Sequence, residues 1–239
     1  MRESAVGAVV AAGEASRVVA PVADAARVVL FDFDGVLIRR DSFGLFIRDR
    51  YARSLLRKLA VLPTLPWLLA SWPISWRLPV RTLVHVGLLG TGERGYRRAA
   101  EDFAATLTRR SRLFIGEGLQ ALRRHQQAGD RVVVVTGCEI TLVQAILHDL
   151  GLRDLEVIGS RFRPGWLGMR VAEHNVGRAK VAALRARGIV AWRVAYSDSA
   201  QDLPMLRGAR EPVLVNATPS LCKRVERGLG RSVGRVAWR

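Results

Sequence analysis

The sequence contains little cysteine. Its 239 residues include only Cys138 and Cys222, and two cysteines cannot form the framework of disulfides that holds small secreted domains together. A chain of this length can bury a full hydrophobic core without such cross-links. We therefore expect a protein of a reducing compartment.

Acidic residues and lysine are also scarce. The chain has 38 Lys and Arg against 21 Asp and Glu, a formal net charge of +17, and its only lysines are Lys58, Lys180 and Lys223. Such a surface favours polyanions: nucleic acid, anionic lipid headgroups or phosphorylated substrates. We expect no nucleic-acid partner, because no segment resembles a nucleic-acid-binding module and the aromatic residues are not interleaved with basic runs. Compositional bias on solvated faces is an alternative explanation of the arginine excess.

Uninterrupted apolar segments are missing as well. Residues 1–26 are rich in Ala and Val, but acids interrupt them and they lack the basic start of a secretory signal. We expect an N-terminal extension there. The uncharged stretch Leu59–Trp76 contains three prolines, which would break the ~20-residue helix that a membrane span needs.

That stretch nevertheless has features of a membrane interface. It holds Trp67, Trp72 and Trp76, and basic residues flank it on both sides. Indole rings favour the headgroup level and cations favour anionic lipid. We expect a re-entrant hairpin or a shallow helix pair at the membrane surface. The alternative is a proline-punctuated helical cap that packs against the core.

Polar motifs follow several apolar runs. Val28–Phe31 reads as a buried strand, and Asp32-Phe33-Asp34-Gly35 comes directly after it. Val132–Val135 reads as a second strand, followed by Thr136-Gly137. Because open α/β sheets build their sites at the carboxyl ends of strands, we expect a site there, with Gly35 allowing the chain to turn between two carboxylates.

Two later motifs belong to the same pattern. Lys180 lies at the start of a predicted amphipathic helix. A third strand around Val194–Tyr196 ends in Ser197-Asp198-Ser199-Ala200-Gln201-Asp202. Each polar group thus falls at the end of a strand or the start of a helix.

The spacing of these elements predicts the domain organisation. Residues 27–40 and 113–220 are assigned to an α/β core, and about a hundred residues separate its first two strands, far more than one crossover helix needs. We therefore assign 41–112 to an inserted helical cap. Residues 221–239 are predicted to be a basic tail that is peripheral to the fold. Alternation around Pro164-Gly165 predicts a hairpin flap.

These motifs, in this order, resemble the haloacid dehalogenase superfamily of phosphotransferases, in particular its phosphoserine-phosphatase-like subgroup. The resemblance implies an α/β fold, a doubly wound parallel sheet with an inserted helical cap. Asp41-Ser42-Phe43-Gly44 and Gly165–Met169 are further similar to the bacterial phosphatidylglycerophosphatase C family. Cys138-Glu139 departs from the Ser-Pro more common there.

The resemblance implies roles for three aspartates. Asp32 would be the nucleophile that forms an aspartyl-phosphate, and Asp34 the general acid and base. Mg²⁺ would be held by the Asp32 carboxylate, the Asp34 main-chain carbonyl and Asp198.

It also implies a phosphate-binding set. Thr136 and Lys180 would act on the phosphoryl group, with Gly137 beside them in the substrate site. Asp202 would support the metal or position Lys180, and the start of a helix is its structural alternative. Asp41 and Ser42 would order the start of the cap.

The expected function is that of a magnesium-dependent phosphomonoester hydrolase. The resemblance and the apolar stretch point to a lipid phosphate such as phosphatidylglycerophosphate, met at an anionic membrane on the cytoplasmic side of the bacterial inner membrane. Two alternatives stay open: a cytoplasmic phosphatase of a small metabolite such as phosphoserine, and a noncatalytic polyanion-binding protein that has kept the fold.

Overall fold

The computed structural model describes residues 27–75 and 77–239. The expected N-terminal extension and Trp76 lie outside the described residues. A sheet of seven strands runs through the α/β part in the order β4-β3-β2-β1-β5-β6-β7. The strands are β1 (Val28–Phe31), β2 (Arg131–Glu139), β3 (Glu156–Gly165), β4 (Gly168–Glu173), β5 (Trp192–Ser197), β6 (Ala209–Val215) and β7 (Gly234–Val236).

The sheet is parallel except for one hairpin. Neighbouring strands from β3 to β7 in the sheet order pair in parallel, with Phe31 of β1 opposite Val134 of β2 and Tyr196 of β5. β4 pairs antiparallel with β3, with Phe162 opposite Val171. The α/β fold and the hairpin flap are therefore confirmed.

Alternating apolar side chains of the central strands build two cores. Val29 and Phe31 belong to one buried cluster, while Val28 and Leu30 belong to a second one, because successive strand residues point to opposite faces of a sheet. The first cluster includes residues of α6 (Glu93–Leu107), α7 (Gly116–Gln127) and α8 (Ile140–Asp149). The second includes residues of α9 (Arg178–Ala186), α10 (Leu203–Gly208) and α11 (Pro219–Leu229). Helices thus cover both faces of the sheet.

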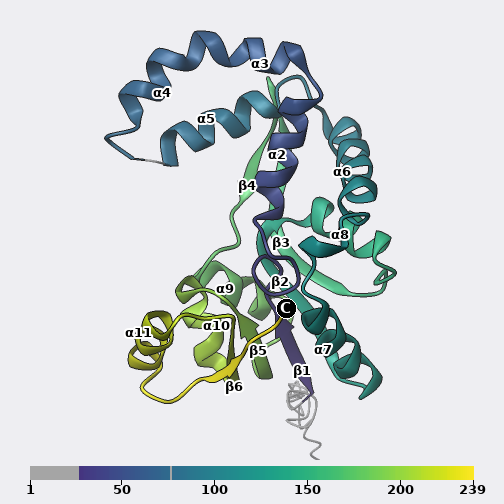
Figure 1. Cartoon of the computed structure of the whole chain (residues 1–239), viewed down its shortest axis with the longest axis vertical. Helices are drawn as coiled ribbons and strands as arrows, with labels where there is room; N and C mark the ends of the chain where they lie inside the picture. Colours follow the sequence, from purple (N-terminus) through teal and green to yellow (C-terminus); the bar gives the residue numbers. More distant parts are fainter. Residues whose placement is uncertain (1–26, 76) are drawn as a thin grey trace, which may run out of the picture.

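The segment between β1 and α7 consists mainly of helices. It contains α2 (Ser42–Ala52), α3 (Leu55–Val61), α4 (Leu65–Ser71), α5 (Arg77–Gly87) and α6. Asp41 begins α2 as its N-cap, with its side chain accepting the N–H of Gly44, as predicted. In Figure 1, α3, α4 and α5 lie at the end of the molecule far from α11 and β6.

These outlying helices leave much of their apolar surface exposed. Exposed side chains in them and at the end of α4 include Leu56 (80%), Leu69 (75%) and Trp72 (66%). The alternative in which Leu59–Trp76 packs against the core is therefore wrong for its described part. No helix within residues 27–75 and 77–239 has both the length and the apolar character to cross a membrane.

The C-terminal segment is part of the fold, so the prediction of a peripheral tail is wrong. α11 packs Cys222 and Val225 into the second core. β7 then adds a parallel strand beside β6, and Trp238 packs on Tyr196 with ring centroids 5.3 Å apart. The sequence did not predict this packing, because arginines and glycines separate the few apolar residues of the segment that are buried.

Candidate active site

The loop after β1 forms the centre of the site. The Asp32 N–H donates to the Tyr196 carbonyl at 2.9 Å, so Asp32 lies at the carboxyl end of β1 and is still hydrogen-bonded to β5. Gly35 then turns the chain with φ at +78°. A Cβ atom at position 35 would lie 1.9 Å from Asp198 Oδ2, so glycine is needed here for space as well as for its backbone conformation.

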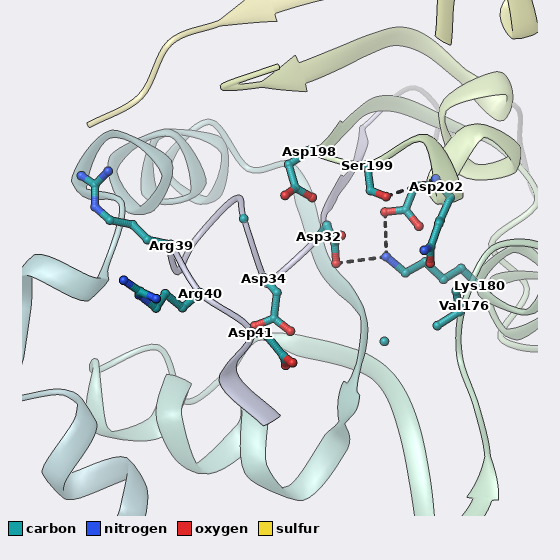
Figure 2. A pocket seen from close by; sticks show the side chains of 13 residues that line it. Asp32, Asp34, Arg39, Arg40, Asp41, Val176, Lys180, Asp198, Ser199 and Asp202 are labelled. Carbon is teal, nitrogen blue, oxygen red and sulfur yellow. Dashed lines mark hydrogen bonds and ion pairs between the residues drawn. The ribbon is translucent and has the colours of Figure 1, made fainter. Parts of the chain in front are cut away.

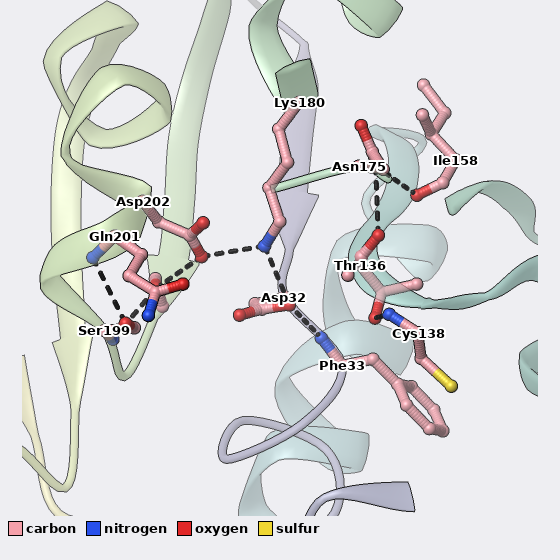
Figure 3. A network of polar contacts seen from close by, with 12 residues as sticks. Asp32, Phe33, Thr136, Cys138, Ile158, Asn175, Lys180, Ser199, Gln201 and Asp202 are labelled. Atoms are coloured by element: carbon pink, nitrogen blue, oxygen red, sulfur yellow. Dashed lines mark hydrogen bonds and ion pairs between the residues drawn. The ribbon is translucent and has the colours of Figure 1, made fainter. Parts of the chain in front are cut away.

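Lys180 lies between two carboxylates. Its Nζ is 3.0 Å from Asp32 Oδ1 and 2.8 Å from Asp202 Oδ2, and the residue is only 2% exposed (Figure 3). Burial by itself lowers the pKa of Lys180, but the charges of Asp32 and Asp202 outweigh it and raise the pKa above its usual value. The ammonium group is therefore a fixed positive charge next to Asp32.

Asp202 positions this lysine. Besides Lys180, its Oδ2 accepts the hydroxyl of Ser197 at 2.8 Å. Asp202 is also the N-cap residue of α10, as the structural alternative expected, but its side chain makes no capping hydrogen bond there. A buried carboxylate that accepts one hydrogen bond from the cation and a second from a neighbouring hydroxyl fits the predicted positioning role.

Asp34 is in a different environment. Its Oδ1 accepts the main-chain N–H of Ser42 at 3.0 Å, at the start of α2. Burial raises the pKa of Asp34 to about 6, although the hydrogen bonds from Ser42 oppose this shift. A carboxyl group with this pKa can hold a proton near neutral pH and release it to a substrate.

The three aspartates share one pocket with Lys180 and Asp202. Figure 2 shows Lys180 and Asp202 on one side of it and Arg39 and Arg40 on the other. Its volume is about 330 Å³. Its lining consists of Asp32, Asp34, Gly35, Arg39, Arg40, Asp41, Gly137, Val176, Lys180, Asp198, Ser199, Gln201 and Asp202.

The carboxylates of this pocket suit a hard cation. Burial raises the pKa of both Asp32 and Asp198, so their charged forms are incompletely compensated by the protein's own groups. Oxygen ligands of this kind are those that Mg²⁺ prefers. In the described part of the chain no group of three His, Cys, Asp or Glu side chains could hold a metal, and the predicted set contains only two carboxylate side chains.

Thr136 is not among the residues that line the pocket. Its side chain is fully buried, and its Oγ1 accepts the main-chain N–H of Cys138 at 3.0 Å. Gly137 does line the pocket. The structure therefore brings the predicted Gly137, but not the Thr136 hydroxyl, to the pocket wall.

Sequence reasoning missed Asn175. This residue is 5% exposed, and its Nδ2 donates to the carbonyls of Thr136 at 3.0 Å and Ile158 at 3.1 Å (Figure 3). It thereby links the adjacent strands β2 and β3, next to Gly137 of the pocket wall. An amide-bearing residue shortly before the helix of Lys180 was the available signal.

Arg39 and Arg40 were missed as well. Both are exposed and line the pocket. The signal was two consecutive cations between the acids Asp34 and Asp41.

Cys138 and Glu139 have structural environments. The Ser42 hydroxyl donates to Cys138 Sγ at 3.2 Å, and burial raises the pKa of this thiol well above its usual value, which disfavours a thiolate nucleophile. The Glu139 carboxylate accepts the N–H of Leu142 at 3.0 Å and caps α8. The two residues that stand in place of the family's Ser-Pro thus each make a local structural contact.

Comparison with protein families gives one match that covers most of the chain. The model of the family described as haloacid dehalogenase-like hydrolase matches residues 29–207. A histidinol-phosphatase of Neisseria meningitidis serogroup C is 27% identical over 114 residues, which are 43% of this chain and 50% of that protein. The matched segment thus spans half the length of that relative.

Solved structures share the fold at low sequence identity. A protein of unknown function from Bordetella pertussis Tohama I has a TM-score of 0.66 and 18% identity, covering 87% of this chain and 98% of its own. A phosphoserine phosphohydrolase-like protein from Francisella tularensis has a TM-score of 0.56 and 14% identity, covering 88% and 94%. A substrate-bound phosphoserine phosphatase has a TM-score of 0.51 and 18% identity, covering 87% and 92%.

Proposed function

Because this chain belongs to the haloacid dehalogenase-like hydrolase family, we propose that it is a phosphomonoester hydrolase that works through an aspartyl-phosphate on Asp32. One observation carries the proposal: Asp32 lies 3.0 Å from the buried Lys180 ammonium group, in the pocket that Asp34 and Asp198 also line. A phosphate monoester resists attack because its negative charge repels nucleophiles. A fixed cation beside the attacking carboxylate reduces that repulsion.

The two neighbouring aspartates divide the chemistry. In the first step an Asp32 oxygen bonds to phosphorus while the bond from phosphorus to the leaving oxygen breaks, and Asp34 gives its proton to that oxygen. In the second step Asp34 takes a proton from the water that attacks the aspartyl-phosphate, which releases phosphate and restores Asp32. Lys180, held by Asp202, stays charged throughout and faces the phosphoryl oxygens.

The donor set fits Mg²⁺ as the cofactor. The Asp32 and Asp198 carboxylates and the Asp34 main-chain carbonyl would hold it. When bound, Mg²⁺ supplies positive charge that offsets the negative charges of substrate and carboxylates.

We further propose a lipid phosphate as the substrate class, with phosphatidylglycerophosphate as the first candidate. The supporting observation is the exposed apolar surface of α3–α5, which carries Leu56 of α3, Leu69 of α4 and, in the connection from α4 to α5, Trp72 and Ile74. Each large apolar side chain left in water forgoes about 1.5–3 kcal/mol of burial free energy. A peripheral helix pair on an anionic membrane surface, as on the cytoplasmic face of a bacterial inner membrane, would recover part of it. The alternative, a cytoplasmic phosphatase of a small metabolite, predicted instead that these side chains would be buried in the cap.

Asp32→Asn tests the mechanism. We expect phosphate release to fall by at least about a thousandfold, because the amide keeps the shape of the side chain but is not a nucleophile. The assay compares phosphatidylglycerophosphate in mixed micelles, phosphoserine and 4-nitrophenyl phosphate, with Mg²⁺ and with excess chelator. Asp154→Asn, which removes an exposed carboxylate elsewhere, is the matched control.

Two results would count against the proposal. Undiminished turnover by Asp32→Asn, or full activity in chelator, would exclude the mechanism. A preference for phosphoserine over the lipid would leave the mechanism intact and exclude the proposed substrate class.

A further inference from the structure

The tip of the β3–β4 hairpin is an exposed apolar element outside the cap. Trp166 is 95% exposed and Leu167 is 46% exposed. The tip lies between Gly165 and Gly168, the last paired residues of the hairpin. An indole this exposed has almost no packing partner within the described chain.

Backbone contacts hold this tip against the cap. The Gly90 N–H donates to the Leu167 carbonyl at 2.9 Å, and Leu89 forms an antiparallel bridge with Gly168. Gly168 has φ at +137°, and a Cβ there would lie 2.2 Å from the Leu88 carbonyl oxygen. The hairpin of the core therefore meets the turn between α5 and α6, as the course of β4 in Figure 1 shows.

Near the tip and in the outlying helices the charged residues are basic. Residues 50–92 contain six Lys and Arg and no Asp or Glu. Residues 157–172 of the hairpin contain Arg161, Arg163 and Arg170 and no acid, and these three arginines are exposed. The acids of the hairpin stand at its two ends, away from the tip: Glu156 begins β3, and Glu173 ends β4 opposite Arg161. An apolar tip with basic neighbours is complementary to an anionic lipid surface, where indoles lie at headgroup level and arginines meet phosphates.

We propose that the Trp166–Leu167 tip is a second membrane-contact element, which inserts into the headgroup layer of an anionic bilayer together with the surface of α3–α5. This inference rests on the proposed lipid substrate. Because the tip belongs to the core sheet while α3–α5 belong to the cap, binding through both fixes the orientation of the pocket relative to the membrane. A single contact would leave the core free to tilt.

Trp166→Ser tests the inference. We expect its partition onto vesicles with about 30% phosphatidylglycerol to fall about tenfold relative to wild type, since one buried indole is lost. Hydrolysis of 4-nitrophenyl phosphate in solution should not change. Val190→Ser is the matched control, because Val190 is 72% exposed in the connection between α9 and β5.

A fluorescence measurement identifies the contact directly. In wild type, lipids brominated near the headgroup should quench a component of tryptophan emission that is absent from Trp166→Phe. Unchanged partition of Trp166→Ser with no quenched component, while wild type binds, overturns the second contact and leaves the lipid-phosphatase proposal standing. Failure of wild type to bind overturns both. A change in sedimentation mass of Trp166→Ser, without a change in partition, assigns the tip to a second copy of the chain and also overturns the inference.

Discussion

Asp32 and Asp34 are two residues apart, yet their surroundings separate their properties. Asp32 Oδ1 lies 3.0 Å from the Lys180 ammonium group, whereas the contact of Asp34 Oδ1 is the neutral N–H of Ser42. Burial raises the pKa of both carboxyl groups, but Lys180 counteracts the rise most strongly at Asp32. Neighbouring acids whose environments differ in this way are suited to the roles of nucleophile and proton donor.

Asp34 should impose a pH dependence on the first chemical step. Its pKa of about 6 means that the proton donor is lost as the pH rises above 6, so kcat/KM for an alkyl phosphate should fall there. 4-Nitrophenyl phosphate should be less affected, because its leaving group needs less protonation. Steady-state kinetics from pH 5 to 8 with both substrates measures this difference.

The Asp34→Asn variant supplies the control for this assignment. The fall in kcat/KM above pH 6 should be absent in this variant. Metal binding should be retained, because the proposed ligand is the main-chain carbonyl. Hydrolysis of the aspartyl-phosphate should also slow, which would give a burst of nitrophenolate. Equal impairment of both substrates without a burst would contradict the general-acid role.

At the scale of elements, the strands that consist of long apolar runs could be predicted from the sequence. Val28–Phe31 and Val132–Val135 are strands because their residues are buried on both faces of the sheet, and the predicted polar motifs follow both runs. β7 could not be predicted in this way, because it has three residues and no buried run. Its place depends on the open edge of β6, which is tertiary information.

In the site, likewise, single residues could be predicted from the sequence, but the contacts between distant segments could not. Gly35 was predicted as a turn residue, but its contact with Asp198 depends on how β1 and β5 are aligned. The hydrogen bonds of Asn175 to Thr136 and Ile158 join three separate segments. Motif spacing places residues on strands and helices; it does not show which side chains meet across them.

Deletion of residues 231–239 tests the importance of the C-terminal element. It removes β7, the buried Val233 and the contact of Trp238 with Tyr196, and it exposes the edge of β6. We expect a loss of about 3 kcal/mol and a Tm lower by about 10 °C for a chain of this size. Thermal unfolding followed by circular dichroism measures it, with the exposed Ser232→Ala as control. An unchanged Tm would mean that this segment is peripheral after all.

At the scale of the whole molecule, charge and apolar surface coincide. The net charge of +17 creates a field that attracts anionic surfaces in general. The exposed residues of α3–α5 give that attraction a preferred place, because the acid-free segment 50–92 contains them. Charge alone predicts salt-sensitive binding to any polyanion, whereas charge with exposed apolar side chains predicts binding that retains an apolar component at high salt.

Vesicle binding should therefore have two separable parts. Raising the salt concentration from about 0.05 to 0.5 M shortens the Debye length from above 10 Å to about 4 Å and should weaken binding without abolishing it. Leu69→Ser with Trp72→Ser should remove the part that remains at high salt, because both side chains are exposed. Trp67 is left unchanged, because its indole N–H donates to Thr82 Oγ1 at 3.1 Å and supports the pairing of α4 with α5. Sedimentation with vesicles of increasing phosphatidylglycerol content measures both parts. Binding by the double variant that equals wild type at every salt concentration would show that α3–α5 do not contact the bilayer.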